Sequence, residues 1–145
     1  MRSVLLRVME LPRYVRKTPS FLRFFLRKKV AYSIYPYIFL PEPIYENLRS
    51  ENPEITFQAL LVHEEEHRRE QKKGPFKFAL QYIFSTSFRR DEELKAVNAA
   101  IQYLKGKGIS VDLSQKREPY DPRFLFLYPI SEILSAEQLA YLVKH

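Results

Sequence analysis

The hydrophobic residues of this chain form short runs that are separated by prolines and glycines. A polar residue followed by proline, at 18–19 and again at 52–53, is a cap-then-proline signature that predicts one helix over 19–29 and another over 53–73. Between them, residues 30–40 are rich in β-branched and aromatic side chains. The proline inside that run predicts an edge strand or a strand in two pieces.

The same kind of pattern predicts the remaining elements. They are helices over 2–10, 75–84, 89–105 and 135–143 and a short strand over 109–113. The helix over 53–73 changes character along its length, because its first half is apolar nearly all round while its second half is densely charged. This pattern predicts a buried helix that emerges into solvent near His63.

The predicted helices and strands together make the fold class α+β, and the composition favours one compact domain. The 145 residues are 46% hydrophobic and 14% aromatic, which rules out disorder for most of the length. The absence of cysteine excludes a disulfide scaffold, a thiolate zinc finger and a cysteine nucleophile, so any metal must be held by histidine or carboxylate. No run approaches ~20 apolar residues and the start of the chain is a poor signal peptide, so we expect a cytoplasmic protein without a membrane span.

The net charge of +7 belongs to one end of the chain. Residues 1–29 hold nine basic residues against one glutamate and sum to +8, so residues 30–145 sum to −1. We therefore divide the domain into a basic N-terminal helical arm (1–29), a core (30–105) and a C-terminal tail with a helix (106–145). The arm could contact a membrane surface or nucleic acid, but a solvated helix packed on its own domain is the favoured interpretation.

Two of the three histidines stand in the segment His63-Glu64-Glu65-Glu66-His67, which matches the H-E-x-x-H motif inside a predicted helix. At this spacing both imidazoles lie on one face of the helix, about one turn apart, and can bind a single Zn²⁺. Glu64 lies beside them, where its carboxylate can take a proton from a zinc-bound water. The motif predicts His63 and His67 as metal ligands and Glu64 as the general base.

Three other interpretations of this segment stay open at the level of sequence. Because Glu66 precedes His67, the same residues satisfy the inverted motif H-x-x-E-H. The segment also holds one E-x-x-H, half of a di-iron carboxylate site, but the chain has no second one. Finally, the segment could be a solvated helix end whose glutamates pair with Arg68, Arg69 and Lys73.

A catalytic zinc site normally has three protein ligands, so a third ligand must lie elsewhere in the chain. His145 is the only other histidine, and the longer motif of the metzincins is absent. We therefore expect a carboxylate from the next helix, which offers Asp91, Glu92 and Glu93. Glu93 is favoured, although neighbours on a helix differ by ~100° in direction and the sequence does not separate it from Glu92.

Two motifs of this chain occur together in a known family of metallopeptidases. They are His63-Glu64-x-x-His67 and Glu93-x-x-Ala96. With them the core resembles the gluzincins, and most closely their minimal members, the minigluzincins. The resemblance implies a zincin-like α+β fold with a small sheet, an edge strand, a zinc-binding helix and a glutamate helix. It also implies that Glu93 is the third zinc ligand, that the small Ala96 lets the two helices pack closely, and that substrate pairs with the edge strand.

The function that this resemblance implies is hydrolysis of a peptide or protein substrate by a zinc-dependent metallopeptidase, with Zn²⁺ as cofactor and Glu64 as general base. The alternative is a non-catalytic zincin-like binding module whose basic arm contacts an anionic membrane or nucleic acid. Minimal gluzincins can be latent, which suggests that residues 115–145 plug the cleft. Packing of that tail around its own apolar residues is the favoured alternative.

The family pattern is incomplete in two respects. Many gluzincins carry an aspartate four positions after the zinc-binding glutamate, where it orients a zinc-bound histidine, and here that position is Val97. The residue that stabilises the oxyanion is also undetermined, and for each candidate a structural role is the simpler expectation. The candidates are Tyr82, Tyr103, Tyr120, Tyr128 and Arg90.

Overall fold

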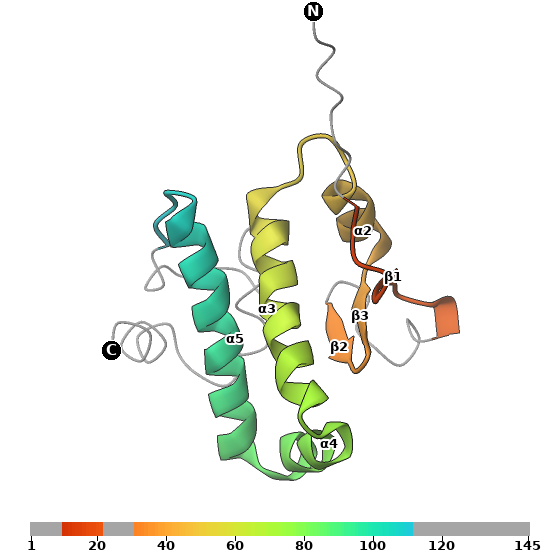
Figure 1. Ribbon diagram of the computed structural model, residues 1–145, viewed down its shortest axis with the longest axis vertical. Coiled ribbons are helices and arrows are strands. Elements are labelled where there is room, and N and C mark those ends of the chain that lie inside the picture. The colour runs from red at the N-terminus through yellow and green to blue at the C-terminus, as the bar shows by residue number, and fades with distance from the viewer. Residues whose placement is uncertain (1–9, 22–30, 112–145) are drawn as a thin grey trace, which may run out of the picture.

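The computed structural model describes residues 10–21 and 31–111 (Figure 1). This part of the chain holds a three-stranded sheet and four helices, so the α+β class predicted from the sequence is confirmed. The strands are β1 (Val15–Lys17), β2 (Tyr32–Ile34) and β3 (Tyr37–Leu40). The helices are α2 (Glu42–Leu48), α3 (Ile55–Lys72), α4 (Pro75–Phe84) and α5 (Thr86–Gly106).

The sheet has the strand order β1-β3-β2, so β3 is central and β1 and β2 are edge strands. β1 runs parallel to β3, with Val15 opposite Ile38. β2 runs antiparallel to β3, with Ser33 opposite Ile38, and a segment with a cis peptide bond between Tyr35 and Pro36 joins the two strands. The predicted strand in two pieces is therefore confirmed, and only its first piece is an edge strand.

The packing of α3 against α5 is the most extensive contact between elements of the described residues (Figure 1). α3 turns one stripe of residues inward, at spacings of one, three and four. The buried residues of the stripe are Ala59, Leu60, His63, Glu64 and His67. α5 meets this stripe with residues that include the fully buried Ala96, Val97 and Ala100. Small side chains at such a contact let the two helix axes approach closely.

β3 and α2 close the hydrophobic core on the other side of α3. Their inward residues join the cluster that contains Leu60 of α3 and Val97 of α5. They are Ile38 and Leu40 from β3 and Ile44 and Leu48 from α2. α3 therefore lies between the sheet and α5, and it is held on both sides.

The prediction that α3 emerges into solvent near His63 is wrong. His63 has no exposed surface and His67 is 7% exposed, so the buried stripe runs on through the charged half of the helix. The charged residues occupy the outer face instead, where Arg69 pairs with Glu66 and Lys73 with Glu70. A dense run of charges along the sequence concealed one buried stripe within it.

Two helices begin at other residues than predicted, for local reasons. α3 begins at Ile55 and not at 53, because Glu54 is still extended and its backbone N–H donates to Asn47 Oδ1 at 2.8 Å. α5 begins at Thr86 and not at 89, because Ser85 Oγ accepts a hydrogen bond from the Phe88 backbone N–H at 3.2 Å and caps the helix earlier.

Several sequence-based predictions fall partly or wholly outside the described residues. The helices over 2–10 and 135–143, most of the helix over 19–29 and the proposed plug over 115–145 lie there. The strand over 109–113 is not formed in its described part, where residues 109–111 are irregular, and neither β1 nor α2 was predicted. Among the described residues, no helix has the length and apolar character needed to cross a membrane.

We expect Leu60→Ala to lower the free energy of unfolding by about 2–5 kcal/mol, because it removes a side chain that is 1% exposed at the centre of the α3 contact. The matched control is Leu80→Ala on α4, whose side chain is 43% exposed and whose loss should cost no more than about 0.5 kcal/mol. Urea unfolding of both variants measures the difference. Equal losses would contradict the described packing of α3.

Candidate metal centre

Two imidazoles of α3 point to one place inside the molecule. His63 and His67 lie one helical turn apart, and their rings meet edge to face with centroids 4.8 Å apart. Their Nε2 atoms are 3.1 Å apart. The helix places both rings on the buried stripe that faces α5, so the spacing of four residues brings the two nitrogens together, as the motif predicts.

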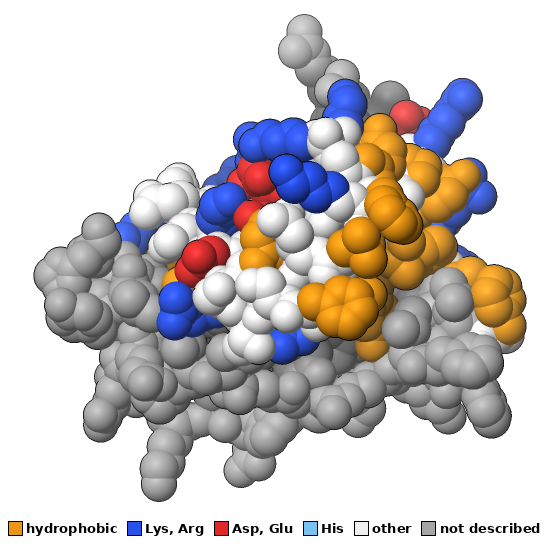
Figure 2. Space-filling view, turned by 90° about the horizontal axis from the view of Figure 1, so that it is seen from below, with side chains coloured by type: hydrophobic (Ala, Val, Ile, Leu, Met, Phe, Trp, Pro, Cys, Tyr) orange, Lys and Arg blue, Asp and Glu red, His pale blue; other side chains and the backbone are white. Residues whose placement is uncertain are grey.

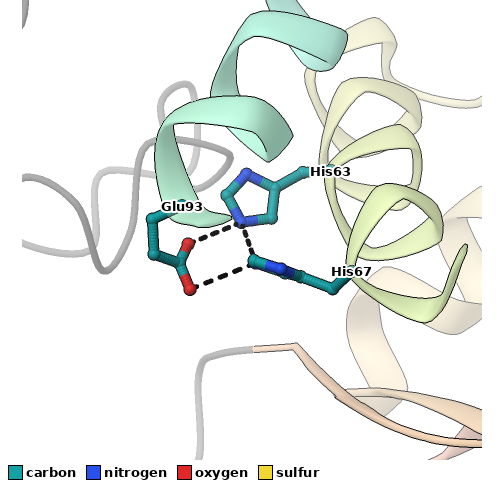
Figure 3. Close-up of side chains that lie close together, drawn as sticks. All are labelled: His63, His67 and Glu93. Carbon is teal, nitrogen blue, oxygen red and sulfur yellow. Dashed lines mark hydrogen bonds and ion pairs between the residues drawn. The ribbon is translucent and has the colours of Figure 1, made fainter. Parts of the chain in front are cut away.

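Glu93 of α5 completes the cluster (Figure 3). Its Oε2 lies 3.2 Å from His63 Nε2, and its Oε1 lies 3.1 Å from His67 Nε2. The neighbouring Glu92 does not join them, because its Oε1 pairs with Lys95 at 2.8 Å. Of the carboxylates that the sequence left open, the structure therefore brings Glu93 to the histidines.

The spacing of these ligand atoms fits a metal ion. An ion with four tetrahedral ligands at about 2.0–2.1 Å holds neighbouring ligand atoms about 3.3 Å apart. The two Nε2 atoms are 3.1 Å apart, close to this value, and the two oxygens of the Glu93 carboxylate lie one beside each of them, at 3.2 and 3.1 Å. All three residues are buried, and each offers one ligand atom within 4.8 Å of the others. His63, His67 and Glu93 could therefore hold a metal ion and leave a fourth position for another ligand.

In the metal-free chain a proton takes the place of such an ion. Burial alone lowers the pKa of His67, but the carboxylates around it, Glu93 first, outweigh burial and raise that pKa to about 9. Burial likewise raises the pKa of Glu93, but His67 and His63 outweigh it and hold the pKa well below its ordinary value. The metal-free cluster is thus a buried imidazolium and carboxylate pair.

Glu64 lies beside the cluster and is 4% exposed. Ser33 Oγ, on the edge strand β2, lies 2.9 Å from Glu64 Oε2 and 2.7 Å from the Glu64 backbone carbonyl oxygen. Glu66, the base of the inverted motif, pairs with Arg69 instead and does not line the cavity described below. The geometry favours the H-E-x-x-H interpretation. Sequence analysis missed Ser33, whose only signal was its place in the strand before α3.

Tyr82 of α4 is the oxyanion candidate that lies at this site. Its hydroxyl donates a hydrogen bond to Glu93 Oε1 at 2.6 Å, and burial, followed by the charge of Glu93, raises its pKa. Tyr103 donates to Gln58, and Arg90 lies beside Asp91. The remaining candidates, Tyr120 and Tyr128, fall outside the described residues.

A cavity of about 400 Å³ opens beside the cluster, between β2 and α4. Glu64, His67 and Glu93 belong to its lining, together with Tyr82. Most of its surface is apolar, and the apolar residues include Ile34, Phe78, Ala79 and Ile83. A ligand in this cavity would lie against a mostly apolar wall and contact the Glu64 carboxylate and the candidate metal ligands His67 and Glu93.

Gln71 binds the open edge of β2. Ile38 donates its backbone N–H to Tyr14 on the far side of the sheet, so the backbone groups of Ser33, which lies opposite Ile38, face away from β3. On that open side, Gln71 Nε2 donates to the Ser33 carbonyl oxygen and Gln71 Oε1 accepts from the Tyr35 N–H, both at 2.8 Å. The side-chain amide imitates the peptide group of a neighbouring strand. Gln71 stands four residues after His67, and that spacing was the overlooked signal.

The carboxylate that orients a zinc-bound histidine in many gluzincins has no counterpart here. Val97 stands at that position and is fully buried in the core. His63 Nδ1 is buried, and no described residue accepts a hydrogen bond from it. The orientation of His63 therefore depends on its packing between α3 and α5 and on Glu93.

No known protein family, curated protein or solved structure matches this chain. The geometry of the site is therefore what indicates the function of this chain. A non-catalytic module that acts through the basic arm stays a prediction, because most of residues 1–29 lies outside the described part of the chain.

We expect the wild-type chain to bind about one metal ion, because two imidazole nitrogens and a carboxylate oxygen, all buried, lie within 4.8 Å of one another. His63→Ala, His67→Ala and Glu93→Ala should each remove most of that metal. Glu92→Ala is the matched control and should keep it, because Glu92 pairs with Lys95. Elemental analysis after exposure to divalent ions and gel filtration measures the content. Equal loss in the Glu92 and Glu93 variants would contradict the assigned ligand.

We expect His67 of the metal-free protein to titrate with a pKa of about 9. Glu93→Gln should lower that pKa, because it removes the negative charge that most strongly stabilises the protonated imidazole. Because the folded pKa is raised, the contribution of His67 to stability is complete below its ordinary pKa of 6.5 and is lost as the pH rises through about 9. Imidazole NMR and urea unfolding across this range measure both. An unchanged His67 pKa in Glu93→Gln would contradict the pairing.

Proposed function

We propose that this chain is a zinc-dependent metallopeptidase of the gluzincin type, with His63, His67 and Glu93 as zinc ligands. The observation that carries the proposal is the buried cluster of these three side chains beside a cavity that Glu64 also lines. Two imidazoles and a carboxylate form a ligand set of catalytic zinc sites, which keep one position open. A bound Zn²⁺ would supply the Lewis acid that makes water a nucleophile near neutral pH.

Glu64 is the general base in this proposal. Its carboxylate takes a proton from the attacking water and later delivers a proton to the leaving amine. The contact between Ser33 Oγ and Glu64 Oε2, at 2.9 Å, supports this role, because it fixes one carboxylate oxygen and leaves the other for proton transfer. Ser33 is then a positioning residue, since it acts through Glu64.

Tyr82 supplies a hydrogen-bond donor beside the reacting groups. Its raised pKa keeps the phenol protonated at neutral pH, and the hydroxyl already lies 2.6 Å from Glu93 Oε1. A donor held in a site with little water stabilises negative charge that develops on a substrate carbonyl oxygen. Because the phenol has a single proton, Tyr82 serves as the oxyanion donor of the proposal by turning its hydroxyl from Glu93 Oε1 to the substrate oxygen.

The substrate of the proposed enzyme is an extended peptide that pairs with β2. The Ser33 carbonyl oxygen and the Tyr35 N–H form the hydrogen-bonding edge that faces the cavity, and a peptide strand would bind them as Gln71 does now. The Gln71 side chain must then give way. Because the cavity wall is largely apolar, with Phe78 and Ile83 in its lining, we expect a preference for apolar substrate side chains.

We expect Glu64→Gln to lower peptide cleavage by about 10²–10⁴-fold without loss of bound zinc, because it removes the base and leaves the ligands. Glu65→Gln is the matched control, since Glu65 accepts a hydrogen bond from Tyr14 and does not line the cavity. The measurement is mass spectrometry of a mixed peptide library after incubation with the zinc-loaded chain.

Two results would contradict the proposal. One is cleavage that persists in Glu64→Gln at the wild-type rate. The other is a wild-type chain that holds zinc but neither cleaves the library nor binds a peptidyl hydroxamate, a zinc-binding group attached to an extended peptide. The hydroxamate arm separates a slow or latent enzyme from a metal site with no peptide-binding function.

A further inference from the structure

α4 is an apolar helix that the described residues leave largely uncovered. Its inner side holds the buried Phe78 and the half-buried Tyr82, one turn apart. Its outer side exposes large side chains: Phe76 is 78% exposed, Ile83 64% and Phe84 81%, and Leu80 is 43% exposed. Single exposed apolar residues are ordinary on a protein surface, but several on one ten-residue helix mark a surface that another partner covers.

The apolar patch continues beyond α4. Ile34 and Tyr37, at the tip of the β2–β3 hairpin, are also exposed, at 50% and 37%. α4 lies at the lower end of the molecule in Figure 1, and Figure 2 views that end. Figure 2 shows hydrophobic side chains gathered together, with lysine and arginine side chains near them and some aspartate or glutamate side chains among these cations.

Basic residues outnumber acidic residues around α4. Residues 70–91 hold five basic residues and two acidic ones, Glu70 and Asp91, which sum to +3. Four of the five basic residues are exposed, namely Lys72, Lys73, Lys77 and Arg90. Lys73 pairs with Glu70, and Arg90 lies beside Asp91. An apolar helical face with lysine and arginine at its borders binds at the interface of an anionic bilayer, where the apolar side chains enter and the cations meet lipid headgroups. A nucleic acid would satisfy the cations but would leave Phe76, Ile83 and Phe84 in water.

We propose that α4 docks on the surface of an anionic phospholipid bilayer, with Phe76, Ile83 and Phe84 entering the interface. The +8 charge of residues 1–29 adds attraction to the same kind of surface. Because Phe78, Tyr82 and Ile83 of α4 also line the cavity, docking places the cavity beside the bilayer. The proposal is independent of the peptidase function and does not require a bound metal.

The test is co-sedimentation of the full chain with vesicles. Wild type should bind vesicles of equal parts phosphatidylglycerol and phosphatidylcholine, bind pure phosphatidylcholine much less, and lose binding in high salt. Phe84→Ser and Phe76→Ser together should reduce the bound fraction by about tenfold or more. Gln102→Ser is the control, because it changes an exposed side chain of α5 that lies outside α4 and outside residues 1–29.

A second readout does not depend on loss of binding. The chain contains no tryptophan, so Phe84→Trp introduces a single fluorophore on the proposed docking face. Its emission should shift to the blue when anionic vesicles are added, and a lipid brominated in its acyl chains should quench it. Phe84→Ser and Phe84→Trp both change a side chain that is 81% exposed, and an unchanged urea midpoint shows that each variant retains the fold.

Four results would overturn the proposal. They are no binding to the mixed vesicles, a loss in Gln102→Ser as large as in the α4 variants, binding to duplex DNA but not to vesicles, and lipid-free self-association that Phe84→Ser abolishes. The last result, seen by sedimentation equilibrium, would assign the patch to a second copy of this chain.

Discussion

The contact between α3 and α5 is the constraint on which the rest of this structure depends. It buries two imidazoles and a carboxylate, groups that are costly to remove from water unless they are paired. The small Ala96 and Ala100 of α5 let the helices approach, and Glu93 then meets both His63 and His67. Without that approach the three ligand atoms would be separate buried polar groups. The polar cluster therefore depends on the close helix approach that Ala96 and Ala100 allow.

The remaining features of the site follow from the same helix. His63, His67 and Gln71 stand at intervals of four residues on α3. One face of the helix therefore carries the two candidate histidine ligands and the amide that hydrogen-bonds the backbone of β2. Glu64, next to His63, meets Ser33 of the same strand. The edge strand is thus held at a fixed distance from the cluster by two side chains of the helix that supplies the ligands. A peptide paired with β2 would displace the Gln71 amide, and the contact between Ser33 and Glu64 would then hold the strand beside the metal position.

Local patterns in the sequence were enough to predict α3, α4, α5 and the cluster. A helix with His at i and i+4 has only one way to present both rings, and α5 offered few carboxylates at a suitable place. Glu93 could not be separated from Glu92 because that choice depends on how α5 is rotated against α3. Ser33 and Gln71 were missed for the same reason, since their contacts cross 31 to 38 positions of the chain. β1, three residues long, was missed because it exists only through pairing with β3.

The two sides of α4 show how a short helix can serve two surfaces. Gly74 and Pro75 separate it from α3, so its direction is set independently of the helix that carries the histidines. Its inner residues, Phe78 and Tyr82, are committed to the cavity and to Glu93. A ten-residue helix that touches the core along one side cannot bury the other side as well. Large apolar residues on that second side are exposed, and an apolar partner, such as the interface of a bilayer, would remove them from water. Residues 70–91 hold five basic residues against two acidic ones, and this excess favours an anionic bilayer over another protein core.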